Sequence, residues 1–202
     1  MSQQQSFIFI GRYAAGKGTQ AKLLMKVLEE SGERKVLDME TGASFRSFFQ
    51  ETGHTQTISK KVVVGGQLMP VFMCVYMWAG ILVEKFTGEE YLVFDGTPRK
   101  LKEAEILESI FPFYGIDKPW VIYLDVEHEE SAKRLTLRAK QVGRADDNNE
   151  EALVKRRKAY EDDVIPTIEW YKKNPNVKFL DIDGERSIEE IHGEIVKLVG
   201  LK

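Results

Sequence analysis

Residues 7–20, "FIFIGRYAAGKGTQ", decide how the rest of this 202-residue chain is interpreted. A short apolar run precedes a glycine-containing loop and a helical pattern, which is the order strand, loop, helix. Gly11, four intervening residues, Gly16 and Lys17 have the spacing of a phosphate-binding loop, in which the N–H groups of a helix amino terminus hold phosphate oxygens. The segment predicts a nucleotide phosphate cradle formed by Ala14, Ala15, Gly16, Lys17, Gly18 and Thr19.

Four further apolar runs predict strands, and helical patterns separate them. The runs cover residues 35–39, 91–96, 120–126 and 177–183, and the helical patterns begin near residues 16, 41, 69, 101, 129 and 150. A last helix is expected over residues 187–199, opened by the capping box of Ser187 and Glu190. This alternation predicts an α/β fold with a parallel sheet covered by helices on both faces. Segments that follow strands should then share one edge of the sheet.

Composition limits the classes of function. A 43% hydrophobic chain of this length predicts one compact domain, and a net charge of -3 argues against nucleic acid or an anionic membrane as partner. The single cysteine, Cys74, permits no internal disulfide and no cysteine zinc cluster, which fits a reducing compartment. The polar start "MSQQQ" lacks a secretory pattern, so we expect a cytoplasmic location.

An uncharged stretch at residues 62–83 is long enough to span a membrane. Gly65, Gly66 and Pro70 instead predict the end of one short helix and the start of another. Methionines at positions 69, 73 and 77 form a stripe that is typical of core packing, so we expect a buried helix.

Charged residues indicate where phosphates and a metal would bind. Asp95 ends a buried strand, where Mg²⁺ reached through a bound water would satisfy its carboxylate; the alternative is that it caps the turn at Gly96 and Thr97. Guanidinium groups bind phosphates in a bidentate manner, and a set at one edge would suit two nucleotides. The candidates are Arg46, Arg99, Arg134, Arg138, Arg144 and Arg156.

The motif order then becomes specific. "GxxxxGKGTQ", "TGASFR", "GGQLMP", "FDGTPR", "RLTLR", "GRADDN" and "KRRKAY" resemble adenylate kinase and related nucleoside monophosphate kinases over nearly the whole chain. The resemblance implies a P-loop nucleoside triphosphate hydrolase-like fold with a five-stranded parallel sheet. It also implies one kinase domain over residues 1–202, with an acceptor-binding part at about residues 40–71 and a short zinc-free lid at about residues 139–147. The implied reaction moves the terminal phosphoryl of Mg-ATP to a nucleoside monophosphate, with AMP the first expectation, in a protein expected to be monomeric.

The resemblance also assigns roles to residues. Lys17, Arg99, Arg134, Arg138, Arg144 and Arg156 match catalytic positions, and Gly184 joins the phosphate loop and Arg134 in binding ATP. Acceptor-binding positions match Thr41, Arg46, Met69, Arg99, Glu103, Arg144 and Arg156. Asp146 and Asp147 match a lid pair that helps closure.

Several positions depart from the family pattern. Tyr13 and Ala14 stand where proline and glycine are usual, Ala43 replaces an aspartate, and Val71 replaces an acidic residue. They raise the alternative of a nucleotide-binding module with little turnover. Glu103 replaces a glutamine that reads adenine; an ionised glutamate only accepts hydrogen bonds, which favours guanine and makes GMP an alternative acceptor. Glu103 could instead be an exposed partner of Lys100 that never meets the base.

Overall fold

The computed structural model describes residues 5–142 and 150–201 and contains a five-stranded sheet in which all strand pairs are parallel. The strand order is β2-β3-β1-β4-β5. The five predicted strands are confirmed, and their bounds are β1 Ser6–Gly11, β2 Lys35–Glu40, β3 Glu90–Asp95, β4 Trp120–Asp125 and β5 Lys178–Asp183.

The central strand β1 explains why its sequence is apolar at every position from 7 to 10. Phe7 and Phe9 belong to the core on one face of the sheet, whereas Ile8 and Ile10 belong to the core on the other. A parallel strand covered on both faces has no solvent-facing side, so a continuous apolar run replaces the usual alternation.

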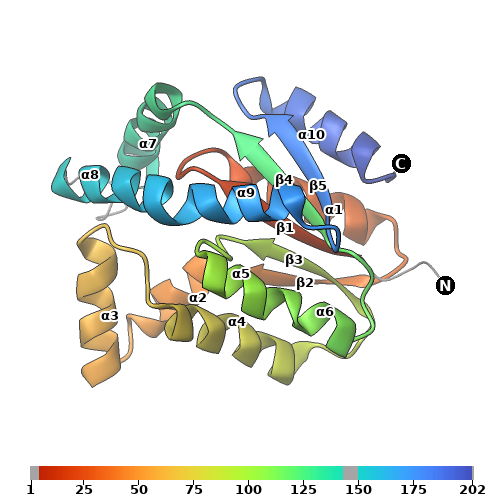
Figure 1. Cartoon of the computed structure of the whole chain (residues 1–202), viewed down its shortest axis with the longest axis horizontal. Coiled ribbons are helices and arrows are strands. Elements are labelled where there is room, and N and C mark those ends of the chain that lie inside the picture. Colours follow the sequence, from red (N-terminus) through yellow and green to blue (C-terminus); the bar gives the residue numbers. More distant parts are fainter. Residues whose placement is uncertain (1–4, 143–149, 202) are drawn as a thin grey trace.

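Helices form a layer on each face (Figure 1). On the Phe7 face, α1 (Lys17–Glu30) packs beside α10 (Ile188–Leu198). The other face is covered by α4 (Val71–Lys85), α5 (Leu101–Glu108), α6 (Ile110–Phe113) and α9 (Ile165–Lys173). The predicted capping box at the start of α10 is confirmed, because Ser187 and Glu190 each accept from the other's backbone N–H.

The remaining helices lie toward the carboxyl ends of the strands, at the left of Figure 1. They are α2 (Thr41–Phe48), α3 (His54–Val64), α7 (His128–Val142) and α8 (Glu150–Ala159), and α8 continues through a π-helical turn, η2 (Tyr160–Val164), into α9. The expected break at Gly65 and Gly66 is confirmed, since α3 ends before them and α4 begins after Pro70.

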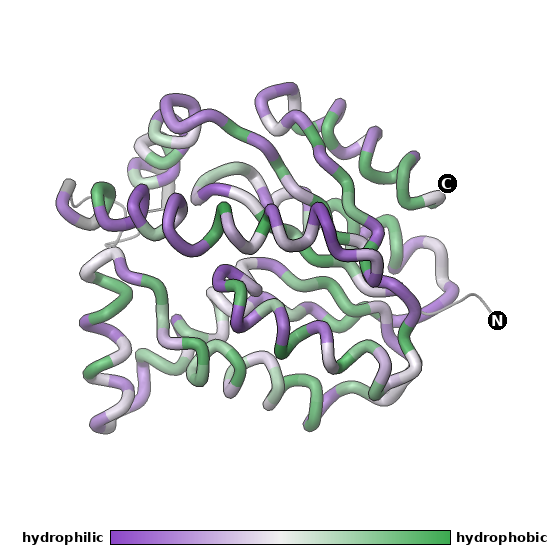
Figure 2. The backbone as a smooth tube through the Cα atoms, viewed as in Figure 1, coloured by the Kyte–Doolittle hydropathy of each residue, from purple (hydrophilic) through white to green (hydrophobic). Residues whose placement is uncertain are grey.

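The apolar helix α4 is buried on one face only, which corrects the expectation of a buried helix. Met73 and Met77 pack in a core cluster with Met69 and Phe45, as the methionine stripe predicts. Phe72, Tyr76 and Val83 are 68%, 64% and 79% exposed. Figure 2 shows how hydrophobic this helix is along most of its length. Among the described residues, we find no helix with the length and hydrophobicity needed to cross a membrane.

Candidate active site

A cavity of about 700 Å³ opens at the carboxyl ends of the strands. The loop after β1, the turn after β3, and helices α2, α7 and η2 contribute to its wall. It gathers most of the predicted site residues: Ala14, Ala15, Gly16, Lys17, Gly18, Thr19, Thr41, Arg46, Met69, Asp95, Arg99, Glu103, Arg134, Arg138 and Arg156. The predicted residues Arg144, Asp146 and Asp147, and most of the predicted lid, lie outside the described residues.

The phosphate loop places its lysine at the start of α1. Lys17 is the first residue of that helix, and its Nζ donates to the carbonyls of Gly11 at 2.9 Å and Arg12 at 2.6 Å. Burial lowers the pKa of Lys17 to about 7; the positive charge of Arg99 also lowers it, and Asp95 opposes the shift. The amine is therefore held beside helix N–H groups with only carbonyl partners, an arrangement that favours an incoming anion.

Ala14 adopts a conformation that the loop sequence does not favour. Its φ is 54°, and it is the one non-glycine residue with positive φ among the described residues. A Cβ in the left-handed region costs about 1–2 kcal/mol. The loop therefore keeps its turn despite the alanine, at a cost in backbone strain.

Asp95 ends β3 next to the phosphate loop. Its Oδ2 would lie 2.9 Å from a Cβ at position 18, so Gly18 is needed for the carboxylate to approach α1 this closely. Burial raises the pKa of Asp95, while Lys17 and Arg99 oppose that shift. Among the described residues no cluster of three or more His, Cys, Asp or Glu side chains could hold a metal. A single carboxylate fits Mg²⁺, which keeps several waters and binds substrate phosphates.

The predicted acceptor-binding residues Thr41, Arg46 and Arg99 come from α2 and the turn after β3. Arg46 donates to the Glu40 carboxylate at 2.6 Å, and Arg99 Nε donates to the Gly96 carbonyl at 2.9 Å. Thr41 Oγ1 donates to the Asp95 carbonyl at 3.4 Å, which joins α2 to the end of β3. Two guanidinium groups thus reach the cavity from different elements.

The side chain of Glu103 is buried, unlike the exposed partner of Lys100 that was the alternative expectation. It is 1% exposed, and its carboxylate accepts from Thr97 Oγ1 and from the backbone N–H of Arg99, the latter at 2.8 Å. The alternative of a surface pair with Lys100 is wrong, because the carboxylate is buried and bonded within its own turn.

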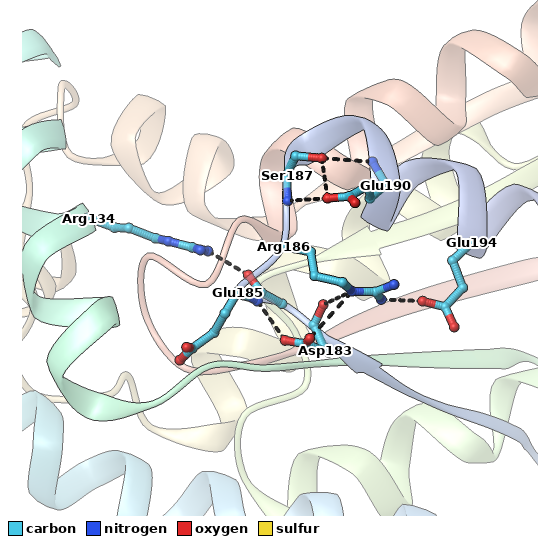
Figure 3. Close-up of polar contacts among 8 residues, drawn as sticks. Arg134, Asp183, Glu185, Arg186, Ser187, Glu190 and Glu194 are labelled. Carbon is cyan, nitrogen blue, oxygen red and sulfur yellow. Dashed lines mark hydrogen bonds and ion pairs between the residues drawn. The ribbon is translucent and has the colours of Figure 1, made fainter.

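The remaining arginines of the cavity wall, Arg134, Arg138 and Arg156, come from helices α7 and α8. Arg134 donates through Nε to Glu130 at 2.9 Å and through Nη1 to the Gly184 carbonyl at 2.8 Å. Figure 3 shows Arg134 reaching from α7 toward the turn before Glu185. Gly184 itself does not line the cavity; a Cβ there would lie 2.6 Å from Val126 Cγ2, so close packing requires glycine.

Ion pairs hold the turn that carries Gly184. Arg186 bonds to Asp183 and Glu194, and the Ser187–Glu190 capping box follows directly (Figure 3). The carbonyl that receives Arg134 is therefore part of a turn fixed on both sides.

Two residues of the phosphate loop have roles that the sequence did not indicate. Arg12 donates through Nε to the Val126 carbonyl at 3.2 Å, and its guanidinium carbon lies 3.9 Å from the centroid of the Tyr160 ring. The carbonyl of Tyr13 accepts from Ser131 Oγ at 2.5 Å. The loop is thus attached to α7 and η2; the unusual residues at positions 12 and 13 were the available signal, but their partners are more than 100 residues away.

Comparison with known proteins agrees with this geometry. Residues 9–176 match the family model described as adenylate kinase. Proteins named adenylate kinase from Phocaeicola vulgatus and Parabacteroides distasonis are 30% and 32% identical, covering 96% and 95% of this chain and 97% and 96% of their own lengths. One from Leptospira biflexa is 31% identical over 95% of this chain and 98% of its own. The chain therefore belongs to the adenylate kinase family, a family of phosphotransferases.

Proposed function

We propose that this protein transfers the terminal phosphoryl of Mg-ATP to AMP, giving two ADP. The observation that carries the proposal is the convergence of Lys17, Asp95 and arginines from α2, the β3–α5 turn, α7 and α8 on one cavity. Phosphoryl transfer depends on positioning and on neutralising charge spread over the transferring group, and it needs no covalent intermediate.

Each part of the cavity has a task in this reaction. Helix α1 and Lys17 hold the donor phosphates, and Arg99 and Arg46 hold the acceptor phosphate after Arg46 exchanges its Glu40 partner. Arg134, Arg138 and Arg156 neutralise charge on the donor side, with Arg144 joining them from the lid at about residues 139–147. Asp95 would hold Mg²⁺ through a bound water, and the ion would supply neutralisation of phosphate charge when bound. The protein acts as a cytoplasmic monomer that requires no zinc.

A panel assay tests this function. ATP is offered with AMP, GMP, CMP or UMP in turn, with and without Mg²⁺, and diphosphate formation is followed. We expect Mg²⁺-dependent turnover, fastest with AMP. ATP binding without turnover of any monophosphate would instead favour the nucleotide-binding module.

The variant Lys17→Met tests the role of the lysine in phosphoryl transfer. The ammonium gains importance as charge moves onto the transferring phosphoryl, so turnover should fall about a hundredfold or more while ATP affinity falls less. Single-turnover rates and ATP titrations of the same preparation separate the two effects. Near-native turnover in this variant would contradict the role of the phosphate loop.

A further inference from the structure

The buried carboxylate of Glu103 points to a function different from base recognition. Resting on the proposed function, we propose that Glu103 is a positioning residue that fixes Arg99 for the acceptor phosphate. The geometry of the turn between β3 and α5, residues 96–100, carries this inference.

The carboxylate accepts two hydrogen bonds from the turn between β3 and α5. Thr97 Oγ1 and the Arg99 N–H donate to different oxygens of Glu103. The Cys74 thiol, on α4, donates to the Met69 carbonyl at 3.9 Å, and burial together with the negative charge of Glu103 raises the pKa of the thiol to about 12. Glu103 is 1% exposed and both of its oxygens already accept from the turn, so its remaining lone pairs are poorly accessible to a base edge.

Hydrogen bonds restrain the backbone of Arg99 on both sides of its Cα. Its N–H donates to Glu103 at 2.8 Å, and its carbonyl lies 3.4 Å from Thr167 Oγ1, whose hydroxyl is shared with the closer Asp163 carbonyl at 2.8 Å. Its side chain donates to the Gly96 carbonyl at 2.9 Å. The guanidinium therefore projects into the cavity from a turn whose backbone is anchored by Glu103.

A guanine-reading role would require a different arrangement. Guanine presents N1–H and N2–H side by side, and a carboxylate that binds both must turn both oxygens toward the cavity. In this turn each oxygen of Glu103 already accepts from Thr97 or Arg99. A base that replaced those donors would leave the Arg99 N–H without a partner and would release the turn, at the cost of a buried donor.

The proposal is tested by measuring dissociation constants with titration calorimetry for AMP, GMP and the base-free probe ribose 5-phosphate. Glu103→Ala should weaken all three by the same factor, about tenfold, because the loss acts through the phosphate contact. Glu103→Gln should recover most of this loss, since its amide oxygen can still accept from the Arg99 N–H. Glu105→Gln, a change at an exposed position on the same helix, is the control and should leave the three constants unchanged.

A double-mutant cycle measures the coupling between Arg99 and Glu103 in AMP affinity, which general destabilisation of the protein would not produce. In the Arg99→Ala background, Glu103→Ala should have no further effect on AMP affinity. The proposal would be overturned if the AMP-to-GMP affinity ratio shifted by more than about threefold in either Glu103 variant. It would also be overturned if the effects of the Glu103 and Arg99 substitutions on AMP affinity were independent. If Glu103→Ala does not fold, the AMP-to-GMP affinity ratio of Glu103→Gln is the deciding measurement. An unchanged ratio then supports the proposal. A wild-type chain that binds ATP but none of the three probes would overturn the proposed acceptor chemistry, whereas a shifted ratio overturns only the role of Glu103.

Discussion

At the scale of single residues, the lowered pKa of Lys17 predicts that nucleotide binding takes up a proton. Its pKa of about 7 leaves the amine largely neutral at pH 8, and the phosphates of a bound nucleotide favour the charged form. We therefore expect ATP binding at pH 8 to take up close to one proton, and uptake to vanish below about pH 6, where the amine is already charged. Calorimetric titrations in buffers of different ionisation enthalpy measure this uptake. Lys17→Met should abolish it, and equal uptake by this variant would contradict the assignment.

Ala14 offers a second test at this scale. Ala14→Gly removes the strain of the left-handed conformation and should stabilise the protein by about 0.5–1 kcal/mol. For a chain of this size that corresponds to a rise in Tm of about 1–4 °C. The neighbouring change Ala15→Gly is the control and should lower Tm, because Ala15 is 1% exposed in the core and its φ is not positive. A lower Tm for Ala14→Gly would show that the loop relaxes in solution.

At the scale of elements, the contact between Arg12 and Tyr160 couples the phosphate loop to η2, the turn that follows α8. Tyr160 is 5% exposed, so a cation–π pair there should have a coupling energy of about 1 kcal/mol. A double-mutant cycle with Arg12→Met and Tyr160→Leu, followed by denaturant unfolding, measures it. The pair of Lys178 and Trp120, at 5.0 Å, is the comparison and should couple more weakly. Additive effects at positions 12 and 160 would contradict the coupling.

The elements themselves could be predicted because their signals are local. Residues 7–10 are apolar throughout, and Gly65, Gly66 and Pro70 disfavour helix, so the strand and the helix break follow from short segments. The exposed face of α4 could not be predicted in this way, because Phe72 and Met73 are equally apolar and only the packing of α4 distinguishes them.

In the candidate site, too, some residues could be predicted from local sequence, whereas the contacts of others could not. The carboxyl-end rule placed Lys17, Asp95 and Arg99 at one edge, because each lies at or just after the end of a predicted strand. The partners of Glu103 depend on how a buried turn closes against α4, and those of Arg12 depend on segments far along the chain. A sequence pattern does not specify such contacts, because any of several donors could satisfy a carboxylate or a guanidinium.

At the scale of the whole molecule, charge is distributed unevenly. The chain has a net charge of -3, yet the cavity wall carries nine basic and three acidic side chains among the described residues. Raising the ionic strength from about 0.05 to 0.5 M should therefore weaken ATP binding about tenfold, because screening acts on the field that attracts the anion. The Tm should change little, since the core is apolar. Calorimetry and thermal melts over the same salt series measure the ATP affinity and the Tm. An ATP affinity that does not change with salt would contradict the claim that the positive charge of the cavity strengthens ATP binding.

The order of the strands determines when the cradle can form during synthesis. Strand β1 leaves the ribosome before its partners, which are residues 92–95 of β3 and residues 120–124 of β4. A nascent chain that ends before residue 92 has neither neighbour for β1, and its apolar residues must be kept from aggregating by other means. The loop that begins at the end of β1 is therefore held in place on both sides only after Leu124 has been synthesised. Ribosome-bound chains shorter than this should be open to proteases and chaperones at their amino-terminal strand.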